Sequence, residues 1–318
     1  MTIVTNTFLT YSAVGNREDL SDTIYNISPR ETPFMSSISR AKASAITHEW
    51  QTDALAAATA TNAQLEGDDT SFSSVTATVR LSNTLQISRK DVIVSGTQEE
   101  VNKAGRKSEF SYQVAKKGLE LRRDMETVIC GNFTQVPASS SGATTARVMR
   151  PLCAWITTND NRNGSSVTGV DGSSTQWATD GTQRAFTESQ VQTVLQACWT
   201  QGGNPDMIMT GAFNKTRFST FTGNATRMDK SEDRKVIATT DVYVSDFGEH
   251  KIVANRFSRS RDVFVLDTEY WGVAFLRPFK TEDLAKTGDA QKKHIIVEYT
   301  LESRNEAASG VIADLTTS

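Results

Sequence analysis

The sequence has few cysteines and no long hydrophobic run. Its three cysteines, Cys130, Cys153 and Cys198, include no CxxC pair, so the sequence predicts neither a disulfide framework nor a zinc site. A membrane-spanning helix needs about 20 nearly uncharged apolar residues, and no such run is present. The first 20 residues also lack the basic and apolar regions of a signal peptide. These absences predict a protein without membrane contact, made in reducing cytoplasm and either kept there or released without passing an oxidising compartment.

The sequence also lacks an excess of one charge. It holds 34 basic and 37 acidic residues, a formal net charge of −3, whereas a dedicated DNA-binding domain is normally basic. Its 318 residues, 37% of them hydrophobic, suggest about two domains or one domain with large extensions. The core material is adequate but lean for this length.

Motifs of catalysis are missing as well. The sequence contains no GxSxG nucleophile elbow, no Walker P-loop and no GxGxxG turn. His48, His250 and His294 have no second histidine or cysteine at ligand spacing, which favours ordinary hydrogen-bonded histidines. Cys130 and Cys198 fall on apolar helix faces and are predicted to be core residues. We therefore predict no catalytic, cofactor-binding or metal-binding residue.

One basic cluster could contact phosphate. It consists of Arg256, Arg259 and Arg261. Because Asp262 and Asp267 follow directly, the favoured interpretation is that these arginines pair with acidic groups, such as Asp262 or the carboxylates of a neighbouring subunit.

Residues 1–45 predict an extended arm. Pro29 and Pro33 fix their own φ angles and push the preceding residues into extended conformations. Positive and negative side chains balance in this stretch, unlike those of a basic nucleic-acid arm. We therefore expect the arm to contact protein.

Residues 46–95 predict a long two-stranded hairpin. Residues 46–50 form a short extended stretch, and residues 75–81 and 85–87 alternate apolar and polar side chains. Residues 53–74 lie between them and are rich in Ala, Thr, Asn and Gly, so they cannot bury themselves. We expect a hairpin that projects from the body, with an ordinary exposed hairpin of a globular enzyme as the alternative.

Residues 97–130 predict a long helix. Thr97 and Glu100 have the spacing of a capping box, and a continuous helix here would be about 50 Å long. Charged residues, Glu126 among them, are predicted to cover the faces that meet water or adjacent subunits. Apolar residues at three- and four-residue spacing form one stripe. The stripe consists of Val101, Ala104, Val114, Leu121, Met125 and Val128.

The second half of the sequence predicts loops and then a compact α/β block. Residues 132–186 are rich in Ser, Thr, Gly and Asn and are predicted to decorate one surface, around a short strand at 152–156. A helix is predicted from the capping pattern of Thr187 and Gln190 to the glycine pair at 202–203. Residues 212–221 have a second apolar side. Further strands are predicted at 206–210, 242–244, 251–254, 263–266, 272–276, 294–301 and 310–315.

The order of arm, long hairpin, long helix and α/β block resembles the Hong Kong 97-type major capsid fold of tailed bacteriophages, which is an α+β fold. Several segments are similar to the SU-ten-type major capsid proteins of Siphoviridae, and the resemblance covers nearly the whole chain. These segments are RETPFM at 30–35, NPDMIM at 204–209, LD at 266–267, TEDLAKTGD at 281–289 and VEYTLESRNEA at 297–307.

The resemblance implies five regions. They are an N-terminal arm at 1–45, an E-loop β-hairpin at 46–95, a P domain with its spine helix at 96–135, an axial A domain at 136–280 and a return to the P domain with C-terminal strands at 281–318. The axial loops would meet at the centre of a capsomer.

The resemblance also implies a self-assembling structural protein without an active site or cofactor. Family members build homo-hexamers and homo-pentamers of an icosahedral head around double-stranded DNA, with a portal protein at one vertex. Scaffolding, decoration or minor capsid proteins are further implied partners, and DNA contacts are expected to be weak and non-specific. We expect this chain in the virion capsid, and in the bacterial host cytoplasm before assembly.

Two departures and two alternatives accompany this hypothesis. Some proteins of this fold cross-link through an E-loop lysine, but no lysine lies between Lys42 and Lys90, which argues against that chemistry. No long scaffold-like extension precedes the arm, so any scaffolding protein would be separate. The alternatives are an encapsulin-like compartment shell of the same fold and a soluble enzyme with its site in the 132–186 loops.

Overall fold

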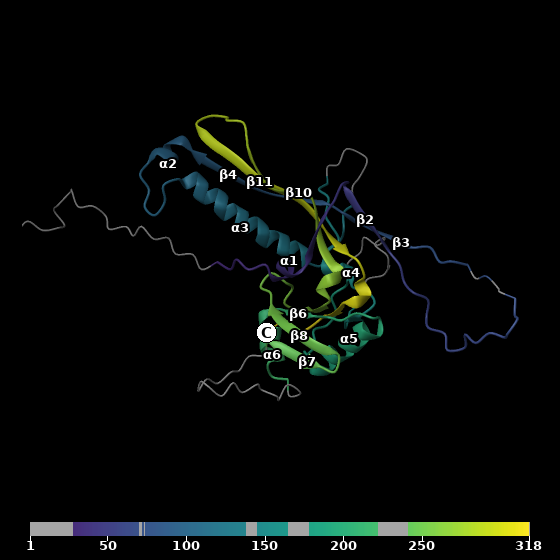
Figure 1. The fold of residues 1–318 in the computed structure, drawn as a ribbon. Helices are drawn as coiled ribbons and strands as arrows, with labels where there is room; N and C mark the ends of the chain where they lie inside the picture. Colours follow the sequence, from purple (N-terminus) through teal and green to yellow (C-terminus); the bar gives the residue numbers. More distant parts are fainter. Residues whose placement is uncertain are drawn as a thin grey trace, which may run out of the picture.

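The computed structural model describes residues 28–69, 72, 74–137, 145–164, 178–221 and 241–317. The first 27 residues of the predicted arm therefore lie outside the described residues. Within the described parts, the strands form a four-stranded sheet in the order β1-β10-β11-β4, a six-stranded sheet in the order β5-β12-β9-β6-β8-β7, and the pair β2-β3 (Figure 1).

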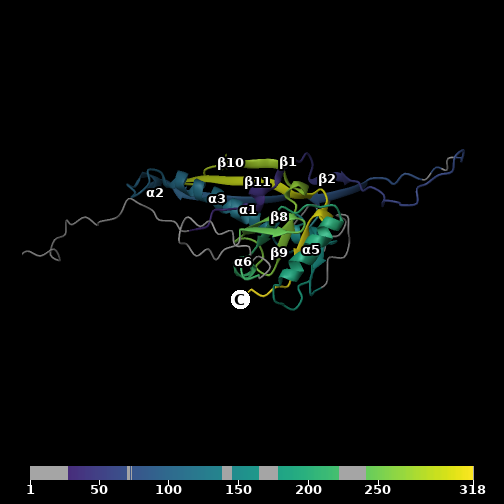
Figure 2. The ribbon, with the colours of Figure 1, turned by 60° about the horizontal axis from the view of Figure 1, so that its bottom comes forward.

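The four-stranded sheet joins the arm to the C-terminal third of the chain. Its strands are β1 (Ser39–Lys42), β10 (Trp271–Asp283), β11 (Ala290–Ser303) and β4 (Gln86–Ser95). β1 runs parallel to β10, and the other pairs are antiparallel. Helix α3 (Glu109–Ile129) lies along this sheet against β4 and β11 (Figure 2). We call this sheet with α3 the four-stranded body.

The predicted continuous helix over 97–130 is wrong, because two helices cover this range. The short α2 (Gly96–Glu100) is separated from α3 by residues 101–108. Gly105 in this connection has φ +73°, a left-handed conformation that interrupts a helix. The charged residues of this range are compatible both with one continuous helix and with two helices joined by a short connection.

The predicted cap of this helix is also wrong. The N-cap of α2 is Ser95, whose side chain accepts a hydrogen bond from the Gln98 N–H. Helix α3 begins after a second serine cap, Ser108. A glutamate at the end of α2, Glu99, accepts hydrogen bonds from the N–H groups of Glu109 and Phe110. The two helices are thus joined by side-chain capping.

The six-stranded sheet carries the α/β block. Helix α5 (Glu188–Thr200) begins with the predicted capping box, and the shorter α6 (Ala212–Phe218) follows β6. We call this sheet with its helices the six-stranded body. Its strands are β5 (Asp160–Asn161), β12 (Gly310–Ile312), β9 (Val263–Leu266), β6 (Met207–Thr210), β8 (Gly248–Ala254) and β7 (Val242–Ser245).

The two bodies share one hydrophobic core. Alternate residues of β6 point to opposite faces of the sheet, so Met207 and Met209 pack in the core that contains Leu121 and Met125 of α3. Ile208 points the other way and packs in a second core with Val194 of α5. Short 3₁₀ turns at Thr268–Tyr270 and Glu306–Ala308 connect strands of the two bodies.

The strand predicted at 152–156 is a short helix, α4 (Leu152–Trp155). It is also a core element, since Leu152, Cys153 and Ala154 are completely buried. The expectation that all of 132–186 decorates a surface is therefore wrong for this part. The apolar run at 152–156 is recognisable in the sequence, but the polar composition around it led to its being assigned to the surface.

The predicted hairpin is formed by β2 (Thr47–Thr52) and β3 (Val79–Thr84), which pair antiparallel. The described residues between these strands contain no helix or strand, and they run far out from the bodies (Figure 1). The strand expected from residue 75 begins only at Val79. After β3 the chain enters β4 and leaves the hairpin for the four-stranded sheet.

Sheet membership differs from the predicted ranges at two places. Residues 271–280 of β10 belong to the four-stranded sheet, although they fall in the range 136–280. Strand β12 belongs to the six-stranded sheet, although it falls in the range 281–318. The chain therefore passes between the two bodies more often than the ranges imply.

Candidate functional site

The three histidines lie at separate positions, as the sequence predicted. His250 is buried, with Nδ1 2.6 Å from the Pro205 carbonyl oxygen and Nε2 2.7 Å from the Ser245 hydroxyl. Burial lowers the pKa of His250, which keeps the ring neutral at physiological pH. His48 and His294 each lie 3.2 Å from one glutamate. The partner of His250 Nδ1 is a backbone carbonyl oxygen and not the carboxylate that orients the histidine of a catalytic triad.

No metal centre is found in the described parts of the chain. Groups of three or more His, Cys, Asp or Glu side chains that could hold a metal ion are absent there. The helices of these parts also include none that is long and apolar enough to cross a membrane.

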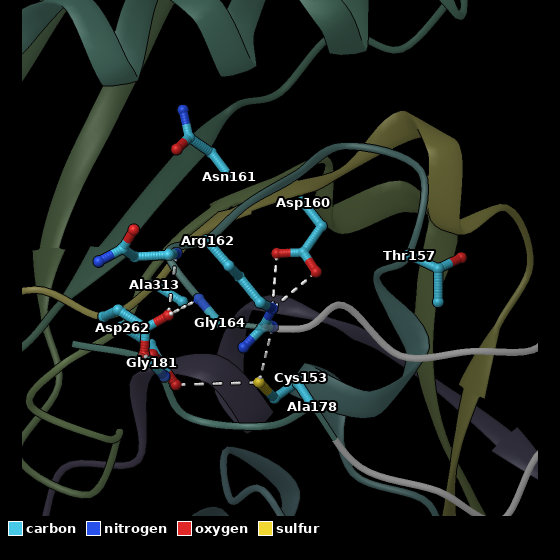
Figure 3. A network of polar contacts seen from close by, with 12 residues as sticks. Cys153, Thr157, Asp160, Asn161, Arg162, Gly164, Ala178, Gly181, Asp262 and Ala313 are labelled. Carbon is cyan, nitrogen blue, oxygen red and sulfur yellow. Dashed lines mark hydrogen bonds and ion pairs between the residues drawn. The ribbon is translucent and has the colours of Figure 1, made fainter. Parts of the chain in front are cut away.

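A buried polar network near α4 is the strongest candidate for chemistry (Figure 3). Cys153 Sγ lies 3.2 Å from Arg162 Nη2 and 3.8 Å from Asp262 Oδ2. Burial and, to a smaller extent, the nearby Asp262 carboxylate raise the pKa of Cys153 to about 11. A completely buried, neutral thiol is a poor nucleophile. The network therefore offers structure rather than catalysis.

Asp314 is the second centre of this network. Its carboxylate is buried and accepts hydrogen bonds from the N–H groups of Asn163, Gly164 and Gly181 at 2.8–3.0 Å, and from Arg261 Nη2 at 2.7 Å. Burial raises the pKa of Asp314, but these donors outweigh burial and hold it below its ordinary value. Its backbone has φ +60°, which Asp tolerates better than most residues. One side chain thus fastens two loops to the C-terminal strand.

The predicted pairing of the arginine cluster with acidic groups is confirmed for Arg259 and Arg261. Arg259 lies 2.8 Å from Asp262 and 2.7 Å from Asp180. Arg261 lies 2.7 Å from Asp314. These cations are neutralised within the chain, which leaves them little attraction for phosphate.

The sequence placed Glu126 on a charged outer face, and this prediction is wrong. Glu126 is completely buried, and its two oxygens accept hydrogen bonds from the N–H groups of Phe34 and Met35 and from Asn255 Nδ2, at 2.7–3.0 Å. Its position one residue after Met125 and four before Cys130, at the border of the apolar stripe, was the available signal. Burial raises the pKa of Glu126, against the effect of its three donors.

The projecting segment, which the structure describes at residues 53–69, 72 and 74–78, exposes apolar side chains. Leu55, Leu65, Phe72 and Val75 are each 80–99% exposed. Monomeric proteins rarely leave large apolar groups unpartnered along one segment. The acidic residues 66, 68 and 69 beside Leu65 make no ion pair with the described parts of the chain.

A groove on the four-stranded body is a second open surface. Its volume is about 620 Å³, and its apolar lining includes Phe275 and Phe279 of β10. Three cations, Arg40, Lys42 and Arg122, also line it. This groove combines apolar surface with positive charge, whereas the projecting segment combines apolar surface with negative charge.

Comparison with known proteins decides which kind of protein has this architecture. The family model of the SU10 major capsid protein matches residues 3–316. The chain belongs to the SU10 major capsid protein family. A relative, the major capsid protein of Escherichia phage Phieco32, is 26% identical over 337 residues, covering 96% of this chain and 96% of the relative.

Solved capsid structures share the fold of this family member. The capsid of cyanophage A-1(L) superimposes with a TM-score of 0.66 at 14% identity, covering 97% of this chain and 98% of the other. The capsid of a native GTA particle gives 0.61 at 10% identity, with 96% and 98% covered. Microbacterium phage Oxtober96 gives 0.58 at 13% identity, with 94% and 95% covered. These likenesses confirm the predicted Hong Kong 97-type α+β fold.

Family and fold confirm the main prediction from the sequence. The chain is a structural protein of a tailed-phage capsid, it is located in the virion, and it associates with itself in the capsid shell. The matched relatives are phage capsid proteins, so the encapsulin-like alternative is not favoured.

Proposed function

We propose that this capsid protein forms homo-hexamers and homo-pentamers of an icosahedral head that encloses double-stranded DNA. The observation that carries the proposal is the projecting segment, whose large apolar side chains are 80–99% exposed. Burying such groups is worth roughly 1.5–3 kcal/mol for each large side chain. A neighbouring copy of the chain would supply the surface that this segment lacks.

Charge complementarity supports this role for a neighbouring copy. Acidic residues flank Leu65 on the projecting segment, and three basic residues border the apolar groove on the four-stranded body. Opposite charges steer association and disfavour wrong registers. The groove is therefore a suitable surface on which the segment of another copy could lie.

The regions follow from the same proposal. We assign residues 1–45 to the N-terminal arm, 46–95 to the E-loop, 96–135 and 281–318 to the P domain and 136–280 to the axial domain, except that residues 271–280 pair in the sheet of the P domain and β12 pairs in the sheet of the axial domain. The course of β2 and β3 supports the E-loop assignment, and the position of α3 along the four-stranded sheet supports its role as the spine helix.

The remaining partners belong to the proposal as well. A portal protein, and scaffolding, decoration or minor capsid proteins, would act at the assembled shell. DNA contacts would be weak and non-specific, because acidic and basic residues nearly balance. We further propose that the protein has no enzymatic activity, since Cys153 is buried and neutral and the described histidines are dispersed.

Electron microscopy of the purified protein under assembly conditions tests this function. We expect closed shells built from hexamers and pentamers. A monodisperse monomer would contradict the proposal. Particles isolated from infected cells should be tailed and filled with DNA, whereas shells filled with cargo protein would support a compartment instead.

A further inference from the structure

Glu126 is a buried carboxylate at which three separate parts of the described chain meet. It belongs to α3 of the four-stranded body, and its oxygens accept hydrogen bonds from the arm at Phe34 and Met35. Its third donor is Asn255, which directly follows β8 of the six-stranded body. The arm, the spine helix and the six-stranded body therefore meet at a single side chain.

The arm depends on this carboxylate for its helix cap. Helix α1 (Pro33–Ser37) has no side-chain cap from Thr32, and Pro33 contributes no N–H. The next two donors, the N–H groups of Phe34 and Met35, both point to Glu126 at 2.8 and 3.0 Å. Glu126 thus takes the place of the missing N-cap, and Phe34 beside it is completely buried.

The carboxylate in turn depends on Asn255. Glu126 forms no ion pair with the described cations, so three neutral donors alone compensate its buried charge. Oε1 accepts from both Phe34 and Asn255, at 2.8 and 2.7 Å. Removing one donor leaves the buried charge less compensated and frees the orientation of the carboxylate toward its other two donors. Burial raises the pKa of Glu126, which is consistent with a charge that needs each of its donors.

Asn255 has no better partner than Glu126. The other contacts of its Nδ2 are sulfur atoms, Met209 Sδ at 3.1 Å and Cys130 Sγ at 3.8 Å, which are weak acceptors. Its Oδ1 accepts from the Phe257 N–H at 2.8 Å, so its orientation is fixed within the six-stranded body. A movement of that body relative to α3 would therefore act first on the bond between Asn255 and Glu126.

We propose that Glu126 and Asn255 couple docking of the arm segment, residues 28–38, to the position of the six-stranded body. When the six-stranded body moves away from α3, Glu126 loses a donor and its hold on α1, and the arm segment is released. The coupling is reciprocal, because linkage between two equilibria acts equally in both directions. It is a property of the single folded chain, so its failure would leave the assembly proposal untouched.

Hydrogen exchange at single-residue resolution on unassembled subunits tests this coupling. Asn255→Ala should accelerate exchange of the Phe34 and Met35 amides by about tenfold or more, as expected for loss of a hydrogen bond to a charged group. The matched control is Asn214→Ala, because Asn214 is equally buried but donates to the Ser260 carbonyl oxygen. Unchanged exchange in Asn255→Ala, or an equal acceleration in the control, would overturn the proposal.

Asn255→Ala could also accelerate exchange of the amides in β6 and β8. In that case a second variant, in the arm, tests the coupling in the opposite direction. Phe34→Ala weakens docking of the arm by removing an arm side chain from the core shared by the two bodies, and it leaves Asn255 and its hydrogen bonds in place. The reporter is the Phe257 amide, which donates to Asn255 Oδ1. Faster exchange of this amide in Phe34→Ala, with the amides of β6 and β8 still protected, would support the coupling. Unchanged exchange of the Phe257 amide would overturn it.

Discussion

At the scale of single residues, Asp314 joins three backbone segments through one carboxylate. Asp314→Asn keeps the shape and tolerates the left-handed backbone, but it removes the charge and turns an N–H donor toward other N–H donors. We expect a loss of about 1.5–3 kcal/mol in the free energy of unfolding, the usual worth of hydrogen bonds to a charged group. Urea denaturation of wild type and variant measures it. An unchanged midpoint and slope would contradict this role of Asp314.

The pH dependence of stability gives a second test of Asp314. Its pKa in the folded chain lies below the ordinary value of 3.8, so its contribution is complete above pH 3.8 and is lost as the pH falls through the folded-state pKa. Glu126 has the opposite sign, since its pKa is raised and its contribution is lost as the pH rises through that value. Asp314→Asn should therefore flatten the fall in stability below pH 3.8. An acid limb as steep as that of wild type would contradict the assignment.

Leu121 tests the buried stripe of α3. It is 1% exposed in the core shared by the two bodies, so Leu121→Ala should cost about 2–5 kcal/mol of stability. The matched control is Lys116→Ala on the same helix, an exposed position that should leave monomer stability within about 0.5 kcal/mol and act on assembly instead. A soluble Leu121→Ala variant with unchanged melting temperature would show that the stripe is placed wrongly.

The residues of this stripe show what sequence periodicity can predict. Leu121 and Met125 are buried and Val114 and Val128 half-buried, as their spacing indicated. The prediction is wrong for Val101 and Ala104, which lie between the two helices, and Val101 is exposed. Glu126 was missed because helical periodicity separates apolar from charged residues and says nothing of distant donors. The N–H groups it accepts from lie more than 90 residues earlier in the chain.

At the scale of elements, local signals worked best where capping and turn residues agreed with periodicity. Helix α5 begins with its predicted capping box and ends shortly before Gly202, which has φ +91°. The interruption between α2 and α3 was missed because its residues are mostly polar and charged, as an exposed helix would also be. Helix α4 was mistaken for a strand, since a short apolar run has no periodicity that distinguishes the two.

Two glycines of this region provide a matched test of the interrupted helix. Gly118 lies inside α3, and an added Cβ would meet Ile295 Cδ1 at an ordinary 3.8 Å. Gly118→Ala should therefore raise stability by about 0.5–1 kcal/mol. Gly105→Ala should instead lower it by about 1–2 kcal/mol, because φ is +73° in the connection. Equal effects in thermal denaturation would indicate that 101–108 can join one continuous helix.

At the scale of the whole molecule, the sheet topology could not be obtained from periodicity. Strand β1 pairs with β10, more than 200 residues later, and β4 pairs with β11 across a similar distance. Alternation along a strand predicts which side chains share a face, but it does not select the partner strand. The capsid architecture came instead from the order of segments and their resemblance to a family, which the family model then confirmed.

The near balance of charges predicts weak binding of DNA by free subunits. With 34 basic and 37 acidic residues, and with Arg259 and Arg261 paired to aspartates, contacts should be local, for instance at exposed cations of α3 and the arm. We expect affinity for duplex DNA weaker than about 1 µM at physiological salt, and a further decrease as salt rises. Filter binding across a salt series measures it. Sub-micromolar, sequence-specific binding that survives physiological salt would contradict a passive shell lining.

The central claim is that this chain completes its packing through neighbouring copies. The most direct measurement is limited proteolysis of residues 53–69 and 74–78 in unassembled subunits and in assembled shells. Ordering each residue costs about 1–2 kcal/mol of backbone entropy, and the projecting segment has no core of its own to offset this cost. We therefore predict rapid cleavage in free subunits and protection in shells, with cleavage elsewhere in the chain as the internal reference. Equal protection in both states would contradict the account.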